Sequence, residues 1–277
     1  MNNPGWSLAL GVQIEMPTFA SVAEARTQDG VRLVLTVGAP GPWGEAAKGL
    51  LHVKKIAFVP VRQEAGSDNP ELVAWKGIRN APQIIAEDDK PLHAWLDLIH
   101  FAENRTPSPS LIPDDPNDRV LMFGMIHELA GTEGYAWSRR LTLFKPIMDL
   151  AKQGENPGFK PVQLMAAQYG YQEEAAERAS DKVAEVLNLL SERLRLQSEA
   201  GNGPYLIGDR LSALDIYWAA FAAMVAPLSP ERCAMPDYLR QAYGTIDETI
   251  TSALTPSLLK HRDYIYDTYL ELPVVFE

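Results

Sequence analysis

The sequence is poor in cysteine and in positive charge. Its 277 residues include one cysteine, Cys233, so an internal disulfide, a CxxC redox pair and a zinc site built of thiolates are excluded. So little cysteine is typical of a reducing compartment, and we expect a cytoplasmic protein. Lys and Arg number 25 against 36 Asp and Glu, a net charge of −11 with no basic stretch to offset it. A nucleic-acid partner is therefore not expected.

Long apolar runs are also missing. The longest, over residues 216–225, follows Asp215 and stops before Pro227, and it is about half as long as a bilayer crossing requires. It predicts a buried core helix, and no membrane partner is expected. The first residues carry no Lys or Arg ahead of their short apolar stretch, so they lack the basic region of a secretory signal.

Strand and helix patterns alternate in the N-terminal third. Residues 1–27 mix proline, glycine and serine without a sustained period, so an irregular extension is expected there. A strand is predicted over 31–37, a helix over 45–55 and a second strand over 56–61. These two strands run parallel, because a helical crossover rather than a tight turn connects them. The loop at 38–44, rich in glycine and proline, ends the first strand.

Further elements complete this domain. A short helix is predicted over 71–76, strands over 83–86 and just after the acidic turn at 87–89, and an amphipathic helix over 92–103. Together with the preceding elements, they predict a mixed four-stranded sheet with helices, in a domain of residues 28–104.

Helical patterns follow a linker. Residues 105–117 contain four prolines with serine and aspartate between them, which is typical of a linker. Beyond it, helices are predicted over 118–131, 135–151, 173–199, 212–225 and 236–253. The fold class is therefore α+β, with an all-helical second domain over 118–277.

Residues 208–216, Gly-Asp-Arg-Leu-Ser-Ala-Leu-Asp-Ile, resemble the helix-capping segment in the C-terminal domain of cytosolic glutathione transferases. Independently of that family, Ser212 and Asp215 have the spacing of a capping box, in which each side chain accepts a hydrogen bond from the other residue's amide. Leu211 can pack onto Ile216 across the first turn. The box satisfies two amides that would each cost about 1 to 3 kcal/mol if buried unpaired.

A second match lies in the first domain. Residues 80–84, Asn-Ala-Pro-Gln-Ile, resemble the cis-proline turn that leads into the third strand of that family. The order of elements also matches, and the resemblance spans residues 30–255. It implies a thioredoxin-like N-terminal domain, a C-terminal all-α bundle, a homodimer, and glutathione as cosubstrate. It also implies that Ala81, which precedes Pro82, pairs its main chain with the cysteinyl part of glutathione.

The side chain that activates the thiol in this family is missing. The family places a Tyr, Ser or Cys in the loop after the first strand. Against its Cys-Pro-Trp and Ser-Pro-Phe variants, that position holds Gly41, followed by Pro42 and Trp43. The catalytic residue is therefore unknown. The amides of Gly41 or Trp43 are one alternative, and a phenol from the second domain is another. The candidate phenols, each of which also suits ordinary packing, are Tyr135, Tyr169 and Tyr171.

A second departure concerns the acidic residue and the serine that open the third helix of the family and bind the γ-glutamyl group. Their positions hold Ala94 and Trp95, so the usual contact cannot form. Asp97, further along, is either a replacement carboxylate or a solvated helix residue. Trp43 and Trp95 either line an apolar groove between the domains or belong to the core or to a dimer interface.

Other polar patterns are less specific. Arg139 and Arg140 follow two aromatic residues on a predicted helix. A guanidinium there holds an anionic substrate, lies on a solvated face or forms an ion pair. His127 has no second histidine at the spacing of a metalloprotease helix, and no metal site is expected. Cys233 has no histidine beside it, so an inert thiol is expected.

The sequence thus predicts a glutathione-transferase-like protein that, if it is an enzyme, conjugates glutathione to a small hydrophobic electrophile. The alternative is a non-catalytic module for a ligand or a protein partner that has lost glutathione binding. The candidate residues of the glutathione site are Gly41, Trp43, Ala81, Pro82, Trp95 and Asp97.

Overall fold

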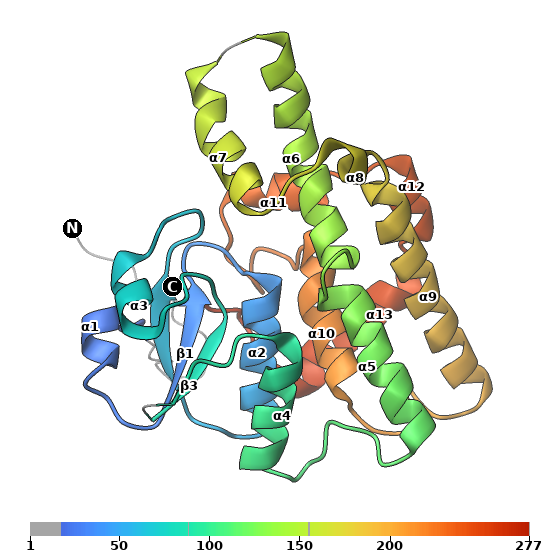
Figure 1. The fold of residues 1–277 in the computed structure, drawn as a ribbon. Coiled ribbons are helices and arrows are strands. Elements are labelled where there is room, and N and C mark those ends of the chain that lie inside the picture. The colour runs from blue at the N-terminus through green and yellow to red at the C-terminus, as the bar shows by residue number, and fades with distance from the viewer. Residues whose placement is uncertain (1–17, 88, 155, 277) are drawn as a thin grey trace.

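A small sheet with flanking helices packs beside a larger set of helices in the computed structural model, which describes residues 18–87, 89–154 and 156–276 (Figure 1). The sheet and its helices come from the N-terminal part of the chain, and the remaining helices follow the linker. This arrangement confirms the α+β fold class, with a C-terminal helical domain.

The N-terminal part alternates strands and helices. Its strands are β1 (Val31–Thr36), β2 (Val59–Gln63) and β3 (Gln83–Ala86). Its helices are α1 (Val22–Ala25), α2 (Pro42–Val53), α3 (Pro70–Lys76) and α4 (Trp95–Arg105). Proline occupies the first position of both α2 and α3, where a missing N–H costs nothing.

The sheet has the order β2-β1-β3. β1 runs parallel to β2, with Leu33 opposite Pro60, and antiparallel to β3, with Val34 opposite Gln83. The parallel pair with α2 between its strands confirms the predicted β-α-β unit. β1 is buried along almost its whole length, which fits its run of β-branched and leucine side chains.

The predicted fourth strand is wrong. In the part of the chain that the structure describes, the sheet has three strands, and only a single bridge links Leu92 to Ile84. Each of the two amides donates to the other residue's carbonyl, at 2.9 and 2.8 Å. Pro91, immediately before Leu92, has no N–H to extend the pairing, and α4 begins three residues later at Trp95.

Part of the expected irregular extension is regular. Residues 1–17 lie outside the described residues, but Ala20 forms a parallel bridge with Val61 of β2. α1 follows directly and begins with a capping box between Ser21 and Glu24. The segment covers the outer edge of β2, so the sheet edge is partly paired there.

The helices beyond the linker are α5 (Pro116–Ala130), α6 (Tyr135–Gln153), α7 (Lys160–Gln168), α8 (Glu173–Glu177), α9 (Ala179–Glu199), α10 (Ala213–Phe221), α11 (Asp237–Gly244), α12 (Glu248–Ala253) and α13 (Pro256–Tyr269). Two short 3-10 turns, η1 (Pro157–Phe159) and η2 (Ala222–Met224), continue this part. No helix among the described residues has the length and apolarity to cross a membrane.

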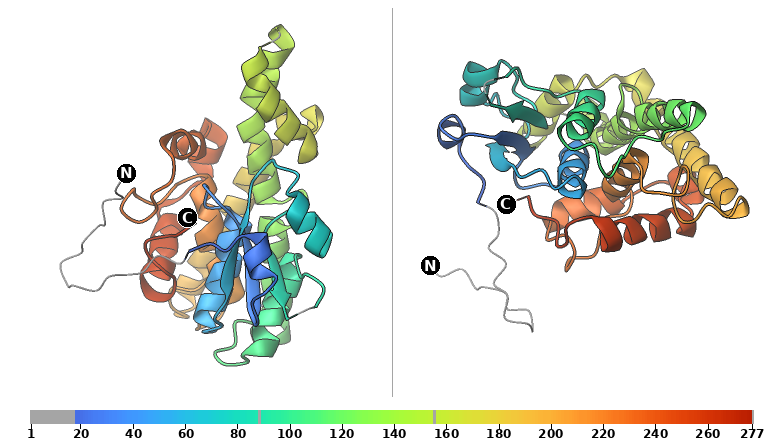
Figure 2. Two further views of the ribbon diagram at one scale, coloured as in Figure 1. Left: turned by 90° about the vertical axis from the view of Figure 1, so that its left-hand side faces the viewer. Right: turned by 90° about the horizontal axis from the view of Figure 1, so that it is seen from below.

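Every helix predicted beyond the linker is present, with differences in detail. The predicted helix at 173–199 is interrupted at Arg178, and that at 236–253 is two helices, α11 and α12. α7 and α13 were not predicted. α6 and α7 together project beyond the rest of the molecule (Figures 1 and 2).

The two parts share one hydrophobic core, centred on α10. All nine residues of α10 are buried, which confirms the predicted core helix. Gly49 of α2 faces it, and a Cβ added to Gly49 would lie 2.7 Å from Cγ2 of Ile216. The glycine therefore allows α2 and α10 to approach closely.

The C-terminal segment returns to the N-terminal part. The amide of Gly38, in the loop before α2, donates to the carbonyl of Phe276 at 3.3 Å. Lys48 of α2 donates from Nζ to the carbonyl of Val275 at 2.5 Å. The C-terminal segment is thus hydrogen-bonded both to the loop between β1 and α2 and to α2 itself.

Candidate functional site

The first turn of α2 presents main-chain donors without acceptors. Gly41 is the N-cap, and its carbonyl accepts from the amide of Glu45 at 2.9 Å. Pro42 has no N–H, and the amides of Trp43 and Gly44 have no acceptor among the described residues. The N-terminus of a helix of this length favours an anionic group.

Gly41 leaves room for a side chain. A Cβ added there would lie 3.8 Å from Cβ and Oγ1 of Thr36, an ordinary contact distance, and the φ of Gly41 is −67°. Neither crowding nor backbone geometry therefore requires glycine at this position. The fold would therefore accept a residue with a hydroxyl, thiol or phenol at position 41, although the sequence has none there.

Ala81 lies at the same end of the sheet. The peptide bond between Ala81 and Pro82 is cis, as in the turn that the sequence resembles. Gln83, two residues after Ala81, is the first residue of β3 and pairs with Val34, two residues before the end of β1 at Thr36. The N–H and C=O of Ala81 have no partner among the described residues. Gly41 and Ala81 therefore both lie near the end of β1.

Trp43 spans the junction between the two parts of the chain. Its Nε1 donates to the carbonyl of Ala130, in α5, at 2.9 Å. Its ring meets that of Phe221, in α10, edge to face at 5.1 Å. The guanidinium carbon of Arg140, in α6, lies 4.8 Å from the centre of its ring. Trp43 thus lies between the two parts of the chain and packs against their shared core, a placement that both of its predicted roles have in common.

Trp95 and Asp97 occupy a different place. Ala94 is the N-cap of α4 and forms no side-chain cap. The Trp95 ring lies 6.4 Å from that of Phe123 and 6.3 Å from that of His127, both on α5. Asp97 is exposed and has no hydrogen bond or ion pair with any described residue. No ring contact within the described residues joins Trp95 to Trp43.

The three candidate phenols differ in their surroundings. Tyr135 is fully buried, donates to the carbonyl of Phe221 at 3.3 Å, and has a pKa raised by burial. The hydroxyl of Tyr171 is buried without a partner, and burial raises its pKa as well. The ring of Tyr169 lies 4.3 Å from the guanidinium carbon of Arg140. Of the three, Tyr169 is therefore the one connected to Trp43, through Arg140.

The two adjacent arginines of α6 have opposite environments. Arg139 is buried and donates to main-chain carbonyls, including that of Met224 at 2.8 Å and that of Thr245 at 2.9 Å. Arg140 is half-buried and forms no hydrogen bond or ion pair with any described residue. Arg139 therefore holds η2 and the end of α11 in place, whereas Arg140 has donors to spare. The sequence indicated only one contact of Arg140, that with Trp137, because the two residues are three apart and share one helix face.

Cys233 is a buried thiol. Burial raises its pKa to about 11, so it is protonated near neutral pH and is a poor nucleophile. This agrees with the predicted inert thiol. No group of three or more His, Cys, Asp or Glu side chains suited to a metal ion occurs among the described residues.

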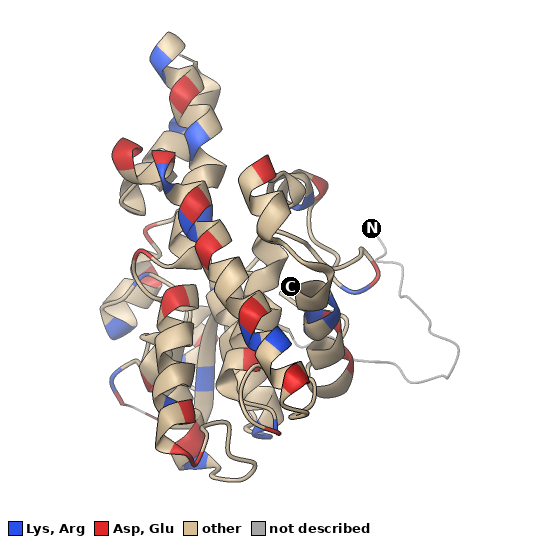
Figure 3. Ribbon diagram, turned by 90° about the vertical axis from the view of Figure 1, so that its right-hand side faces the viewer, with Lys and Arg blue, Asp and Glu red and all other residues tan. Residues whose placement is uncertain are grey.

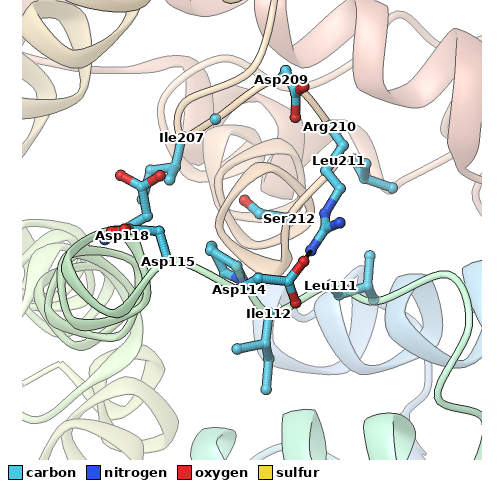
Figure 4. A pocket seen from close by; sticks show the side chains of 12 residues that line it. Leu111, Ile112, Asp114, Asp115, Asp118, Ile207, Asp209, Arg210, Leu211 and Ser212 are labelled. Carbon is cyan, nitrogen blue, oxygen red and sulfur yellow. Dashed lines mark hydrogen bonds and ion pairs between the residues drawn. The ribbon is translucent and has the colours of Figure 1, made fainter.

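A cavity of about 200 Å³ lies where the linker meets the segment before α10 (Figure 4). Its walls come from residues 111–115, Asp118 and residues 207–212. Arg210 and Asp114 form an ion pair of 2.9 Å there. None of the candidate residues expected from the sequence lines this cavity.

The start of α10 confirms the predicted capping box between Ser212 and Asp215. Asp215 is 0% exposed, and its Oδ2 accepts from the amide and the hydroxyl of Ser212, each at 2.8 Å. Its Oδ1 accepts from the amide of Leu206 at 2.8 Å and lies 3.0 Å from Nε2 of His261. The carboxylate thus joins four groups, three more than the sequence indicated. Elsewhere, acidic and basic residues are interspersed along the helices that Figure 3 shows.

Comparison with known proteins identifies similar folds. A model of the glutathione S-transferase C-terminal domain matches residues 141–237. A glutathione S-transferase from Methylobacterium radiotolerans, in complex with glutathione sulfonate, has a TM-score of 0.56 at 16% identity, over 86% of this chain and 91% of that chain. A glutathione S-transferase from Xanthobacter autotrophicus gives 0.54 at 16% identity, over 87% and 96%.

Ure2p in complex with glutathione gives a TM-score of 0.52 at 16% identity, over 84% of this chain and 98% of that chain. The comparison with curated proteins found no match. At these identities the solved structures show a shared fold, and the domain model matches a stretch, residues 141–237, within the helical part of the chain.

Proposed function

Because the chain belongs to the glutathione transferase superfamily, we propose that it binds glutathione at the end of the sheet beside α2 and conjugates it, through its sulfur, to a small hydrophobic electrophile. Three similar solved structures hold glutathione or a relative of it: glutathione sulfonate in one, glutathione in Ure2p, and S-hexylglutathione in a second structure of Ure2p. Glutathione is a tripeptide with a free thiol and two carboxylates, so it needs main-chain partners and anion sites.

One observation carries this proposal: Gly41, next to Thr36, and Ala81, two residues before the start of β3, both lie at the end of the sheet where β1 finishes. The free amides of Trp43 and Gly44 provide donors for a thiolate, and the unpaired main chain of Ala81 provides a donor and an acceptor for the cysteinyl residue. Both sets of groups belong to one end of the sheet, which is the arrangement that a short extended peptide requires.

The reaction needs a thiolate. A free thiol has a pKa of about 8.5, and amides at a helix N-terminus favour the deprotonated form. The thiolate sulfur forms a bond to the electrophilic carbon, the leaving group departs with its electron pair, and the thiol proton passes to solvent. Without a hydroxyl, thiol or phenol at position 41, the first turn of α2 offers only main-chain donors to the anion, and we expect a low rate.

A second candidate function is a binding module that has lost glutathione. The observation that favours it is the start of α4, where Trp95 packs towards Phe123 and His127 and Ala94 provides no cap. The γ-glutamyl group would find neither a hydroxyl nor a carboxylate at these two positions. The two functions differ in whether glutathione binds.

Calorimetric titration with glutathione tests the proposal. We expect a dissociation constant in the millimolar range or below, and a melting temperature that rises with glutathione concentration, since a ligand that binds only the folded state stabilises it. An unchanged melting temperature together with no heat of binding at millimolar glutathione would favour the binding module instead.

Variants of Gly41 test the missing donor. With 1-chloro-2,4-dinitrobenzene as electrophile, we expect Gly41→Ser to raise kcat/KM about tenfold, because the hydroxyl supplies a donor to the thiolate. Gly41→Ala fills the same space without a donor and serves as the matched control, so its kcat/KM stays near that of the parent. Equal rates for the two variants would contradict a thiolate beside position 41.

The proposal also covers the domain boundaries, the cellular location and the oligomeric state of the protein. We propose an N-terminal extension (1–27), a thioredoxin-like domain (28–104), a linker (105–117) and a helical domain (118–277). We also propose a cytoplasmic homodimer. Exposed apolar side chains on α4 and α5 support the dimer, among them Leu96 at 39% and Val120 at 73% exposure. Sedimentation equilibrium at micromolar concentration measures it, and a monomer mass would refute it.

A further inference from the structure

Arg140 is a cation with no counterion among the residues that the structure describes. Its guanidinium carbon lies 4.3, 4.8 and 5.3 Å from the ring centres of Tyr169, Trp43 and Trp137. These rings come from the end of α7, from α2 and from α6, so three separate elements meet at one charge. No carboxylate of the described residues pairs with it, and its N–H groups donate to none of their oxygens.

Burying this guanidinium without a partner costs free energy, unless a ligand supplies an acceptor. A buried charge loses hydration, and aromatic faces replace only part of that loss because they offer no oxygen acceptor. The ionisable groups that act on Arg140 are the phenols of Tyr169 and Tyr243, and burial lowers the pKa of the guanidinium from its ordinary value. Arginine keeps its charge even so. The Arg140 guanidinium therefore remains a cation whose N–H donors are partly shielded from water and have no acceptor among the described residues.

The neighbouring arginine shows that the chain can satisfy such a group. Arg139, one residue earlier, donates to main-chain oxygens of Met224, Ala242 and Thr245 and thereby holds two chain segments together. Arg140 performs no such structural role. It is also half-buried rather than sealed, so a ligand can reach it from solvent.

Position connects Arg140 to the site at α2. Trp43, which it contacts, lies two residues after Gly41 in the first turn of that helix. A molecule that reacts with a thiolate at this turn lies next to Trp43, which also contacts α5 and α10. Close to Arg140 such a molecule meets three aromatic rings and one positive charge.

We infer that Arg140 binds a carboxylate of the second ligand, whose apolar part lies against Trp43, Trp137 and Tyr169. The inference rests on the proposed function and deepens it, because it names the chemical class of that ligand: a small apolar carboxylate. The planar guanidinium offers paired N–H donors that match the two oxygens of a carboxylate.

Glutathione also carries carboxylates, so the test must separate the two sources. The probes are 1-naphthoate and 1-naphthamide, which share a ring system and differ in charge, and both are titrated calorimetrically into the full chain. Glutathione is titrated in parallel. We expect the parent protein to bind naphthoate at least about tenfold more tightly than naphthamide, since one charge-assisted contact distinguishes the two probes.

Arg140→Gln should bring the ratio of the two affinities close to one while leaving the glutathione affinity within about twofold. Arg140→Lys keeps the charge without the planar fork, and an intermediate ratio is expected. Arg26→Gln is the matched control, because Arg26 is exposed at the end of α1 and the change in net charge is the same. This control should retain the ratio of the parent. Thermal melting establishes that each variant is folded.

Equal affinity of the parent for both probes overturns the inference, as does binding of neither probe at millimolar concentration. It is also overturned when Arg140→Gln weakens glutathione and leaves the naphthoate ratio unchanged, because the anion is then part of glutathione. If Arg140→Gln does not fold, Arg140→Lys decides, and an unchanged ratio refutes the inference. Naphthoate selectivity that depends on Arg140 without any glutathione binding supports the inference and refutes only the proposed function.

Discussion

Two helices of this protein have leucine and aspartate at the same positions of their first turn, but the hydrogen bonds of that turn differ between them. α10 starts Ser-Ala-Leu-Asp from Ser212, and α4 starts Ala-Trp-Leu-Asp from Ala94. At α10 the aspartate is buried and its carboxylate joins four polar groups. At α4 the corresponding Asp97 is exposed and has no partner among the described residues. An aspartate three residues after the N-cap thus caps the helix at α10 and remains unpaired within the described residues at α4.

The difference teaches where the chain satisfies its own amides. A helix that must be buried in the core needs internal acceptors, because water cannot reach its first turn. α10 has them, whereas neither α4 nor α2 has a side-chain cap. The uncapped turns keep donors available to solvent or to a ligand, and both belong to the part of the chain that carries the proposed site.

The strongest way to break the comparison is to remove the central carboxylate of α10. Asp215→Ala leaves the amides of Leu206 and Ser212 and the ring of His261 without their acceptor, so we expect a loss of about 3 to 5 kcal/mol in the free energy of unfolding. Urea denaturation measures it. The control is Asp209→Ala in the same loop, where the aspartate is exposed and a change within about 0.5 kcal/mol is expected. Losses of similar size would contradict a special role for the buried carboxylate.

A smaller change converts the start of α10 into that of α4. Ser212→Ala removes the hydroxyl from the capping box, and we expect a loss of about 1 kcal/mol, since serine-to-alanine changes at N-caps usually cost about 0.5 to 2 kcal/mol. The same denaturation measurement applies. Ser198→Ala, at an exposed position inside α9, is the control, and it should be neutral or slightly stabilising. A neutral Ser212→Ala would show that Asp215 caps the helix by itself.

The reverse change has the smallest expected effect. Ala94→Ser gives α4 the cap of α10, at a residue whose φ of −76° and ψ of 136° already suit an N-cap. We expect a gain of about 0.5 to 1 kcal/mol in the free energy of unfolding. Adding Asp97→Ala to this variant tests the second half of the box and should remove part of the gain. No gain in Ala94→Ser would mean that another group already satisfies the first turn of α4.

Patterns within a few residues were enough to predict much of this structure. The β-α-β unit follows from alternation of strand and helix periods, and the capping box follows from two residues three apart. These two features depend on neighbours in the chain, which is why local reasoning reached them. The missing donor at Gly41 came instead from the resemblance to a family, and the structure adds that space for a side chain exists there.

Features that depend on distant residues were not predicted. The fourth strand shrank to one bridge at Leu92, since Pro91 stops the ladder and α4 begins soon after. The sequence left three environments open for Arg140, because Trp43 and Tyr169, which decide among them, lie far away in the chain. His261 joins Asp215 from another helix for the same reason, with no local signal.

The contact of Phe276 with Gly38 and of Val275 with Lys48 has a consequence for biosynthesis. The ribosome makes the loop before α2 early and the segment that holds it only after all the helices have emerged. A nascent chain halted after α13 can already pair β1 with β2 and β3, but its Gly38 amide still faces water. The hydrogen bond of Gly38 is therefore completed late, although Gly38 is among the first parts of the sheet domain to be translated.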